Sequence, residues 1–403
     1  MKRLTCVALL AAALLARGAA PAEKPKVEFK DGDRIVFLGN EFFEREADRG
    51  YIETALTTRF ADKNLTFRNL GYSGDTVRAD ARNLCSGWAV FGPADQGFDR
   101  LKNLIEHIKP TLIFVAYGMN ESFDGPKGLE PFVQGLNHML DMLASNSAPG
   151  VRIVLISPIR HENLGRPLPD PTEHNKSIVL YTDAMEKVAQ QRGYAFINLF
   201  EALGDGTKDA FHTPYTFDGI HLTTYAYWRT AMVLESECCG PGRGLAMHIG
   251  GPPGLTWEEK MLPIAPPPED APKALRDGIA SLPVETVPFL GLRTGTYVLK
   301  NGDQDVASGT AEQWAKGIPV LRGPAISQEE QLRKLIVAKN FDFFNFWRPD
   351  NDTYIFGYRK HEQGRNAVEI PRFESLVAAK EAEIAKLRVP QPHDYMLSRE
   401  ATK

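Results

Sequence analysis

An aspartate and a histidine stand three residues apart in the segment Asp218-Gly219-Ile220-His221. The segment follows a loop and precedes a helix-like run, so both side chains are expected to project from the same side of the turn. In that arrangement the carboxylate orients the imidazole, which can then act as a general base. Taken alone, the two residues are better explained as a helix cap and a surface histidine.

Other polar residues follow the strands that we predict for the first half of the chain. They are Glu41 after residues 34–38, Ser73 and Gly74 after 66–70, Asn120 after 111–117, and Arg160 and His161 after 152–157. Ligands of open parallel sheets bind beyond the carboxyl ends of the strands. All these residues, together with Asp218 and His221, are therefore predicted to share one edge of a sheet.

The strands and helices that position them alternate along the chain, which is typical of a parallel sheet with helices on both faces. Five buried strands are predicted at 34–38, 66–70, 111–117, 152–157 and 195–198. Apolar residues spaced three and four apart predict helices at 51–60, 98–108, 129–143, 172–192 and 223–235. The expected fold is a three-layer α/β/α, flavodoxin-like domain over residues 30–240, with a five-stranded parallel sheet.

The rest of the chain has a different character. Residues 241–271 are rich in Pro and Gly and are interpreted as a linker, and residues 272–403 as a C-terminal α+β accessory segment. Within it, residues 297–300 and 305–308 predict a β-hairpin around Asn301-Gly302, and helices are expected at 328–339 and 373–387. An aromatic cluster from Phe341 to Tyr358 is expected between these helices as core. Trp347 and Arg348 would contact a ligand only if that segment folds over the sheet edge.

The first residues have the parts of a secretory signal peptide. Met1-Lys2-Arg3 precedes an apolar run, and cleavage is expected after Ala22, so the protein is predicted to be exported to the periplasm or outside the cell. No later stretch is long enough for a membrane-spanning helix. The formal net charge of −4 argues against a nucleic-acid partner.

The cysteines and histidines indicate no metal or cofactor. After removal of the signal peptide Cys85, Cys238 and Cys239 remain, and Cys85 can form a disulfide with one of the adjacent pair or stay a structural thiol. The nine histidines lack ligand-like spacing. We therefore expect no metal and no cofactor.

Three of the loop segments resemble the conserved blocks of the SGNH (GDSL-like) esterase and lipase superfamily. Asp218-Gly219-Ile220-His221 is similar to the block that completes a Ser-His-Asp triad. Gly118-Met119-Asn120-Glu121 resembles the block whose Asn donates into the oxyanion hole, and Gly74 matches the glycine whose N–H is the second donor. The resemblance implies an SGNH hydrolase fold with these residues in the catalytic site.

The first block departs from the family. Where the family has Gly-Asp-Ser, this chain has Gly39-Asn40-Glu41, so Glu41 stands in place of the nucleophilic serine. Three alternatives remain open. His221 activates a water that Glu41 helps to position; Ser73 replaces the missing hydroxyl; or the site has lost catalysis and binds a polar ligand such as a glycan.

We therefore expect a hydrolase of small esters, with acylated carbohydrate preferred over lipid. The alternative is a catalytically inactive relative that binds a glycan or a protein. His221, Asp218, Asn120, Gly74 and Glu41 are the expected catalytic residues. Ser73, Arg160 and His161 are expected to contact the substrate, although a surface pair of Arg160 with Glu162 explains that segment equally well.

Overall fold

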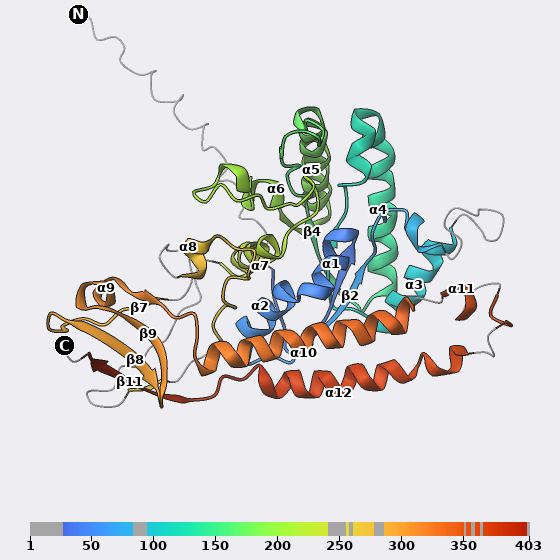
Figure 1. Cartoon of the computed structure of the whole chain (residues 1–403). Helices are drawn as coiled ribbons and strands as arrows, with labels where there is room; N and C mark the ends of the chain where they lie inside the picture. Colours follow the sequence, from blue (N-terminus) through green and yellow to red (C-terminus); the bar gives the residue numbers. More distant parts are fainter. Residues whose placement is uncertain are drawn as a thin grey trace, which may run out of the picture.

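A computed structural model describes most of the chain (Figure 1). The described residues are 27–83, 95–240, 255–257, 261–277, 286–349, 352–355, 359–362 and 366–400. The predicted signal peptide (residues 1–22) and Cys85 lie outside these ranges, so export and the disulfide stay predictions. Among the described residues, no helix is both long enough and apolar enough to cross a membrane.

A five-stranded parallel sheet forms the centre of the molecule, as predicted. Its order is β2-β1-β3-β4-β5. The strands are β1 (Arg34–Gly39), β2 (Thr66–Gly71), β3 (Leu112–Ala116), β4 (Arg152–Ile156) and β5 (Ala195–Ile197). Each strand lies within about a residue of its predicted bounds, because most of these buried runs are apolar, although β2 also contains Arg68 and Asn69.

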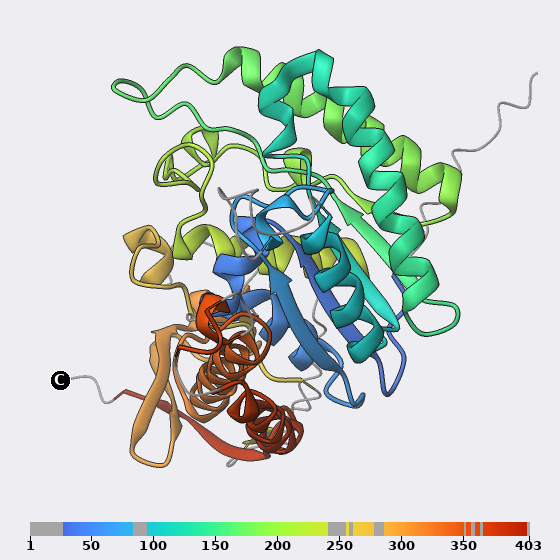
Figure 2. The same cartoon turned by 90° about the vertical axis from the view of Figure 1, so that its right-hand side faces the viewer.

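Helices cover both faces of the sheet, which confirms the three-layer α/β/α class (Figure 2). One face is covered by α1 (Glu41–Arg49), α2 (Tyr51–Arg59) and α7 (Thr224–Cys239). The other is covered by α3 (Gln96–Ile108), α4 (Leu129–Asn146) and most of α5 (Thr172–Arg192). The short α6 (Leu199–Ala202) follows β5.

Helix α1 was not predicted. It is capped by Asn40, whose side chain accepts a hydrogen bond from Phe42 N at 3.2 Å. It ends at Gly50, whose φ of 69° is left-handed, and α2 starts directly after that residue. The sequence of α1 does not reveal its buried face, because the buried residues are Phe43 and the two carboxyl side chains of Glu41 and Glu46.

The C-terminal helices pack along the β2 edge of the sheet (Figure 1). They are α10 (Pro324–Trp347) and α12 (Arg372–Leu387). Lys339 of α10 is fully buried, and its ammonium donates to Glu53 Oε1 at 2.7 Å and to Phe67 O of β2 at 3.0 Å. Helix α10 thus shields an edge strand whose free backbone groups would otherwise be exposed.

The aromatic cluster was misplaced by the sequence prediction. Residues Phe341 to Trp347 lie inside α10 and not between two helices, because the helix continues well past residue 339. Phe343 and Trp347 belong to the same core cluster as the strands, as predicted, whereas Phe341 is 66% exposed, and Phe356 and Tyr358 lie outside the described residues. Tyr354 lies in the short α11 (Asp352–Ile355).

A small antiparallel sheet lies at the end of α10 that is far from α11, on the left in Figure 1. Its order is β6-β11-β8-β9. The strands are β6 (Leu255–Trp257), β8 (Thr296–Asn301), β9 (Gln304–Thr310) and β11 (His393–Arg399), and β7 (Thr286–Val287) pairs with β10 (Ile318–Pro319). Helix α9 (Ala311–Lys316) completes this part, whereas α8 (Lys273–Arg276) buries Leu275 in the core cluster of the parallel-sheet domain. The predicted hairpin is present as β8–β9, with Gly302 at φ 55° in its turn.

Candidate active site

The register of the parallel sheet brings the candidate segments to one edge. Gly39 of β1 pairs with Gly71 of β2 on one side and with Ala116 of β3 on the other. The chains that leave these three residues carry Glu41, Gly74 and Asn120. A Cβ on Gly71 would lie 2.1 Å from Glu44 N, so glycine is needed there for α1 to start so close to β2.

Glu41 is the first residue of α1, and its side chain turns inward. The residue is buried, and its Oε2 accepts a hydrogen bond from Gly74 N at 3.3 Å and a long one from Asn120 Nδ2 at 3.5 Å. These are the two groups that the family resemblance assigns to the oxyanion hole. In this structure the carboxylate of Glu41 therefore binds both of these groups.

Both donors are held by the loop that follows β2. Asn120 Nδ2 donates to Asp75 O at 2.9 Å, which fixes the amide beside Gly74. Gly74 has a φ of 75°, a conformation that L side chains rarely adopt. Loop and amide are thus positioned before any substrate binds, as electrostatic catalysis requires.

The Asp218–His221 pair has the geometry of an oriented base. His221 Nδ1 lies 2.6 Å from Asp218 Oδ2, and the other carboxyl oxygen accepts from His221 N at 2.9 Å. Burial alone would raise the pKa of Asp218, but hydrogen bonds from the His221 ring and backbone outweigh it, so the pKa lies below its ordinary value. Phe217 stacks on the imidazole with 5.7 Å between ring centroids.

Glu41 and His221 line the same cavity, of about 30 Å³. Most of the remaining lining is apolar, including Phe42, Ala116, Met119, Pro158, Ile159 and Leu222. Gly74 and Asn120 do not line it, which agrees with Glu41 binding these donors. A space of this size can hold water or a small group such as methyl.

Glu121 supports the segment that carries Asn120. Its two carboxyl oxygens accept from Val77 N and Gly118 N, both at 2.9 Å, so one side chain ties the loop after β3 to the loop after β2. Burial raises the pKa of Glu121 to about 7, against the opposing effect of these hydrogen bonds.

The three predicted substrate contacts are not brought into the cavity. Ser73 is exposed, and its backbone N–H donates to Glu44 Oε2; among the described residues its hydroxyl makes no hydrogen bond to His221. Arg160 pairs with Glu201 at 3.2 Å and lies 3.9 Å above the Phe200 ring. The surface pair is therefore formed with Glu201 and not with Glu162.

Glu162 instead supports the loop that leads to Asp218, and His161 pairs with a second histidine. Glu162 is buried and accepts from the backbone N–H groups of Gly206, Tyr215 and Thr216 at 2.7 to 3.0 Å. His161 Nδ1 lies 2.8 Å from His174 Nδ1, and burial lowers the pKa of both imidazoles, that of His174 to about 4. Both histidines are thus neutral near pH 7.

Sequence reasoning missed two residues at the mouth of the site. Arg45 lines the cavity one helical turn after Glu41, and its guanidinium lies 5.4 Å from the Phe217 ring. Phe217 itself is 54% exposed beside His221. The i, i+4 spacing of Glu41 and Arg45 would have been visible in the sequence if α1 had been predicted.

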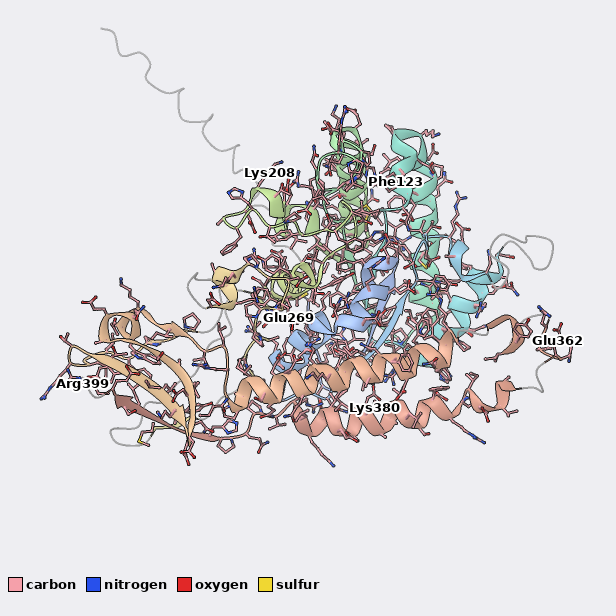
Figure 3. All side chains as sticks on the ribbon, viewed as in Figure 1. Phe123, Lys208, Glu269, Glu362, Lys380 and Arg399 are labelled. Atoms are coloured by element: carbon pink, nitrogen blue, oxygen red, sulfur yellow. The ribbon has the colours of Figure 1, made fainter. Side chains whose placement is uncertain are left out.

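A second exposed aromatic ring follows Asn120 in the chain. Phe123 stacks on His174 with 3.8 Å between ring centroids. Figure 3 places it near the ends of α4 and α5, on the side of the molecule opposite Lys380 of α12.

Within the described residues, no group of three or more His, Cys, Asp or Glu side chains is arranged to hold a metal ion.

Comparison with known proteins places this geometry in a family. Residues 32–229 match the GDSL-like Lipase/Acylhydrolase family. No curated protein matches the chain in sequence. The match covers the whole parallel sheet and both the Glu41 and the Asp218–His221 segments.

Solved structures resemble the chain at low identity. BT4096, described as a gut microbial diltiazem-metabolizing enzyme, is 18% identical with a TM-score of 0.71, covering 94% of this chain and 100% of that chain. A putative GDSL-like lipase from Parabacteroides merdae is 17% identical with a TM-score of 0.44, over 54% of this chain and 100% of its own. An acetylxylan esterase from Geobacillus stearothermophilus is 14% identical with a TM-score of 0.40, over 54% and 99%.

The first of these likenesses shows a shared fold that extends through the C-terminal helices. The sheet order, the segments at its carboxyl edge and the family match agree with one another. The domain that contains residues 32–229 belongs to the SGNH (GDSL-like) hydrolase superfamily, with glutamate in place of its nucleophilic serine.

Proposed function

We propose that the protein hydrolyses a short-chain acyl ester, with His221 as general base and water as nucleophile. The observation that carries this proposal is the shared cavity, which both His221 and Glu41 line. Because Asp218 binds Nδ1 of the imidazole, Nε2 is the ring nitrogen that remains to take a proton.

In the proposed reaction, the water oxygen attacks the ester carbonyl carbon while His221 Nε2 takes one of the water protons. Glu41 accepts a hydrogen bond from the water and positions it. The carbonyl oxygen, which gains negative charge, displaces Glu41 Oε2 from Gly74 N and Asn120 Nδ2. His221 then gives its proton to the leaving alkoxide as the C–O bond breaks, which yields a carboxylic acid and an alcohol.

The proposed substrate is an acylated carbohydrate or another small ester. A cavity of about 30 Å³ favours a short acyl group such as acetyl. The exposed ring of Phe217, next to His221, offers an apolar face on which a sugar ring can stack.

A catalytically inactive protein that binds a glycan or a protein partner is the second candidate. It is favoured by the hydrogen bond from Gly74 N to Glu41 Oε2, because the donors needed for an oxyanion are already occupied. In this alternative the same cleft binds its ligand without turnover.

Hydrolysis of 4-nitrophenyl acetate and of an acetylated xylo-oligosaccharide by purified protein distinguishes the two. Turnover that His221→Ala abolishes and Ser73→Ala leaves unchanged would support water-based hydrolysis. If the wild type is inactive and Glu41→Ser is active, the scaffold lacks only its nucleophile, and the binding function is preferred. Loss of activity in Ser73→Ala would assign the nucleophile to Ser73.

We also propose that the protein is exported to the periplasm or beyond the cell. The basic start, the apolar run and the small residues before Glu23 support a cleaved signal peptide. Mass spectrometry of the protein from the cell envelope or medium of the native host should find Glu23 as the first residue. A cytoplasmic protein that begins at Met1 would contradict export.

A further inference from the structure

The last residues of α10 touch the loop that holds both oxyanion donors. Arg348, which directly follows the helix, lies with its guanidinium 3.4 Å from the centroid of the Tyr72 ring. Trp347 meets the same ring edge to face at 6.1 Å. Tyr72 is the first residue after β2, two positions before Gly74.

One chain of contacts runs from Arg348 to the Gly74 donor. Arg348 Nη1 donates to Glu44 Oε1 at 2.6 Å, and Glu44 Oε2 accepts from Ser73 N. The Arg348–Glu44 ion pair therefore holds the backbone N–H of Ser73. The next residue is Gly74, whose N–H donates to Glu41. The side chains of Arg348 and Glu44 are 25% and 24% exposed, so water only partly screens their attraction.

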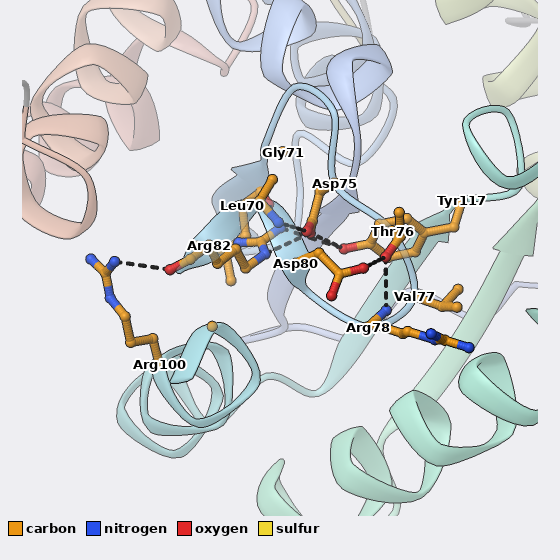
Figure 4. Close-up of polar contacts among 12 residues, drawn as sticks. Leu70, Gly71, Asp75, Thr76, Val77, Arg78, Asp80, Arg82, Arg100 and Tyr117 are labelled. Carbon is orange, nitrogen blue, oxygen red and sulfur yellow. Dashed lines mark hydrogen bonds and ion pairs between the residues drawn. The ribbon is translucent and has the colours of Figure 1, made fainter. Parts of the chain in front are cut away.

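A second chain runs from Trp347 to the Asn120 donor. The Arg82 guanidinium lies over both the Trp347 and the Tyr72 rings, at 5.6 and 5.5 Å from their centroids. Arg82 Nε donates to Asp75 Oδ2 at 2.7 Å, and Asp75 also accepts from Tyr117 at 2.8 Å (Figure 4). The backbone oxygen of Asp75 in turn accepts from Asn120 Nδ2.

From these two chains we infer that the end of α10 positions the oxyanion hole, with Arg348 and Trp347 as positioning residues. We refer to Glu44, Tyr72, Arg82, Trp347 and Arg348 as the clamp. The inference rests on the proposed function, since it concerns the donors of that reaction. It gives the C-terminal segment a role in catalysis besides covering the sheet edge.

Arg333 provides a matched control on the same helix. Its guanidinium also lies over a tyrosine ring, 4.6 Å from Tyr51, and also pairs with a carboxylate, Glu330. It additionally donates to Arg49 O at 2.6 Å, which anchors α10 to α1 at a place that is not part of the loop after β2. Arg333→Met should therefore weaken the docking of α10 without moving the donors.

The test compares Arg348→Met, Arg348→Lys and Arg333→Met in the full-length mature protein. We expect Arg348→Met to lower kcat on 4-nitrophenyl acetate by about tenfold with little change in KM, because slightly misplaced donors weaken only transition-state binding. Arg348→Lys, which keeps the charge for Glu44, should recover part of the loss. Arg333→Met should keep the wild-type kcat even if its melting temperature falls as far as that of Arg348→Met.

Amide hydrogen exchange of residues 72–76 gives a readout that does not depend on activity. It should accelerate in Arg348→Met and stay unchanged in Arg333→Met. Unchanged exchange and kcat in Arg348→Met, or equal losses in Arg348→Met and Arg333→Met, would overturn the inference. If the wild type hydrolyses no ester, the proposed function fails, and the exchange data still decide whether α10 positions the loop.

Discussion

Glu41 Oε2 lies 3.3 Å from Gly74 N, so a carboxylate oxygen binds one of the two groups that we propose as oxyanion donors. Asn120 Nδ2 reaches the same oxygen at 3.5 Å. Both distances exceed the 2.7–3.1 Å or so expected for an oxyanion in such a site. The donors thus hold Glu41 loosely, and a carbonyl oxygen that develops charge can compete for them.

Glu41→Gln tests whether the carboxylate takes part in the reaction. The amide oxygen can still accept from Gly74 and Asn120, but the NH₂ group cannot accept a hydrogen bond from water. We expect kcat/KM on 4-nitrophenyl acetate to fall roughly a hundredfold, a typical cost of a misplaced reactant, because the attacking water loses its positioning acceptor. Near wild-type activity in Glu41→Gln would show that the Glu41 charge has no role.

Asp218→Asn tests whether the imidazole needs its carboxylate. An amide that donates to Nδ1 favours the tautomer with the proton on Nε2, which cannot take a proton from water. Activity should fall by about 10²- to 10⁴-fold, with an unchanged circular dichroism spectrum.

The hydrogen bonds that lower the pKa of Asp218 also stabilise the fold at any pH above the pKa of this carboxyl in the unfolded chain. This contribution is lost as the pH falls through the pKa of Asp218 in the folded protein.

The strands and the Asp218–His221 pair could be predicted because their signals are local. Strands such as β3 are continuous apolar runs, and Asp218, Gly219 and His221 form a compact turn. Two features that depend on contacts distant in sequence were not predicted. Helix α1 has only one buried apolar side chain, Phe43, and it is held in place by the close approach of Glu44 to Gly71.

The contacts of the clamp could not be read from sequence for the same reason. Arg348 meets Glu44 across 304 positions of the chain, and no periodicity links them. Ser73 and His161 were expected in the cleft because they follow strands, but that rule places the backbone and not the side chain. The Ser73 backbone is held by Glu44, and the His161 ring is held by His174.

Glu121 should make stability depend on pH near neutrality. Its carboxyl ionises near pH 4.5 in an unfolded chain and near pH 7 in the folded protein, where burial raises the pKa. Between these values the folded state binds more protons, so the free energy of unfolding should fall by about 3 kcal/mol as the pH rises.

Urea unfolding of wild type and Glu121→Gln at several pH values measures this contribution. Because glutamine does not titrate, the unfolding free energy of the wild type minus that of Glu121→Gln should fall as the pH rises from 4.5 to 7. It should stay constant above about pH 8. Parallel pH profiles would contradict the raised pKa.

The buried Lys339–Glu53 pair should be essential for docking α10. Both side chains are almost inaccessible, at 1% and 4% exposure, and the ammonium also binds Phe67 O of β2. Lys339→Met leaves Glu53 as a buried charge without its partner, which typically costs about 3–5 kcal/mol. Lys334→Met, at a side chain 72% exposed on the same helix, should change stability by less than about 0.5 kcal/mol. Equal urea midpoints for the two variants would mean that the docking of α10 does not depend on this pair. Adding Glu53→Gln to Lys339→Met should recover part of the lost stability, because it removes the buried charge.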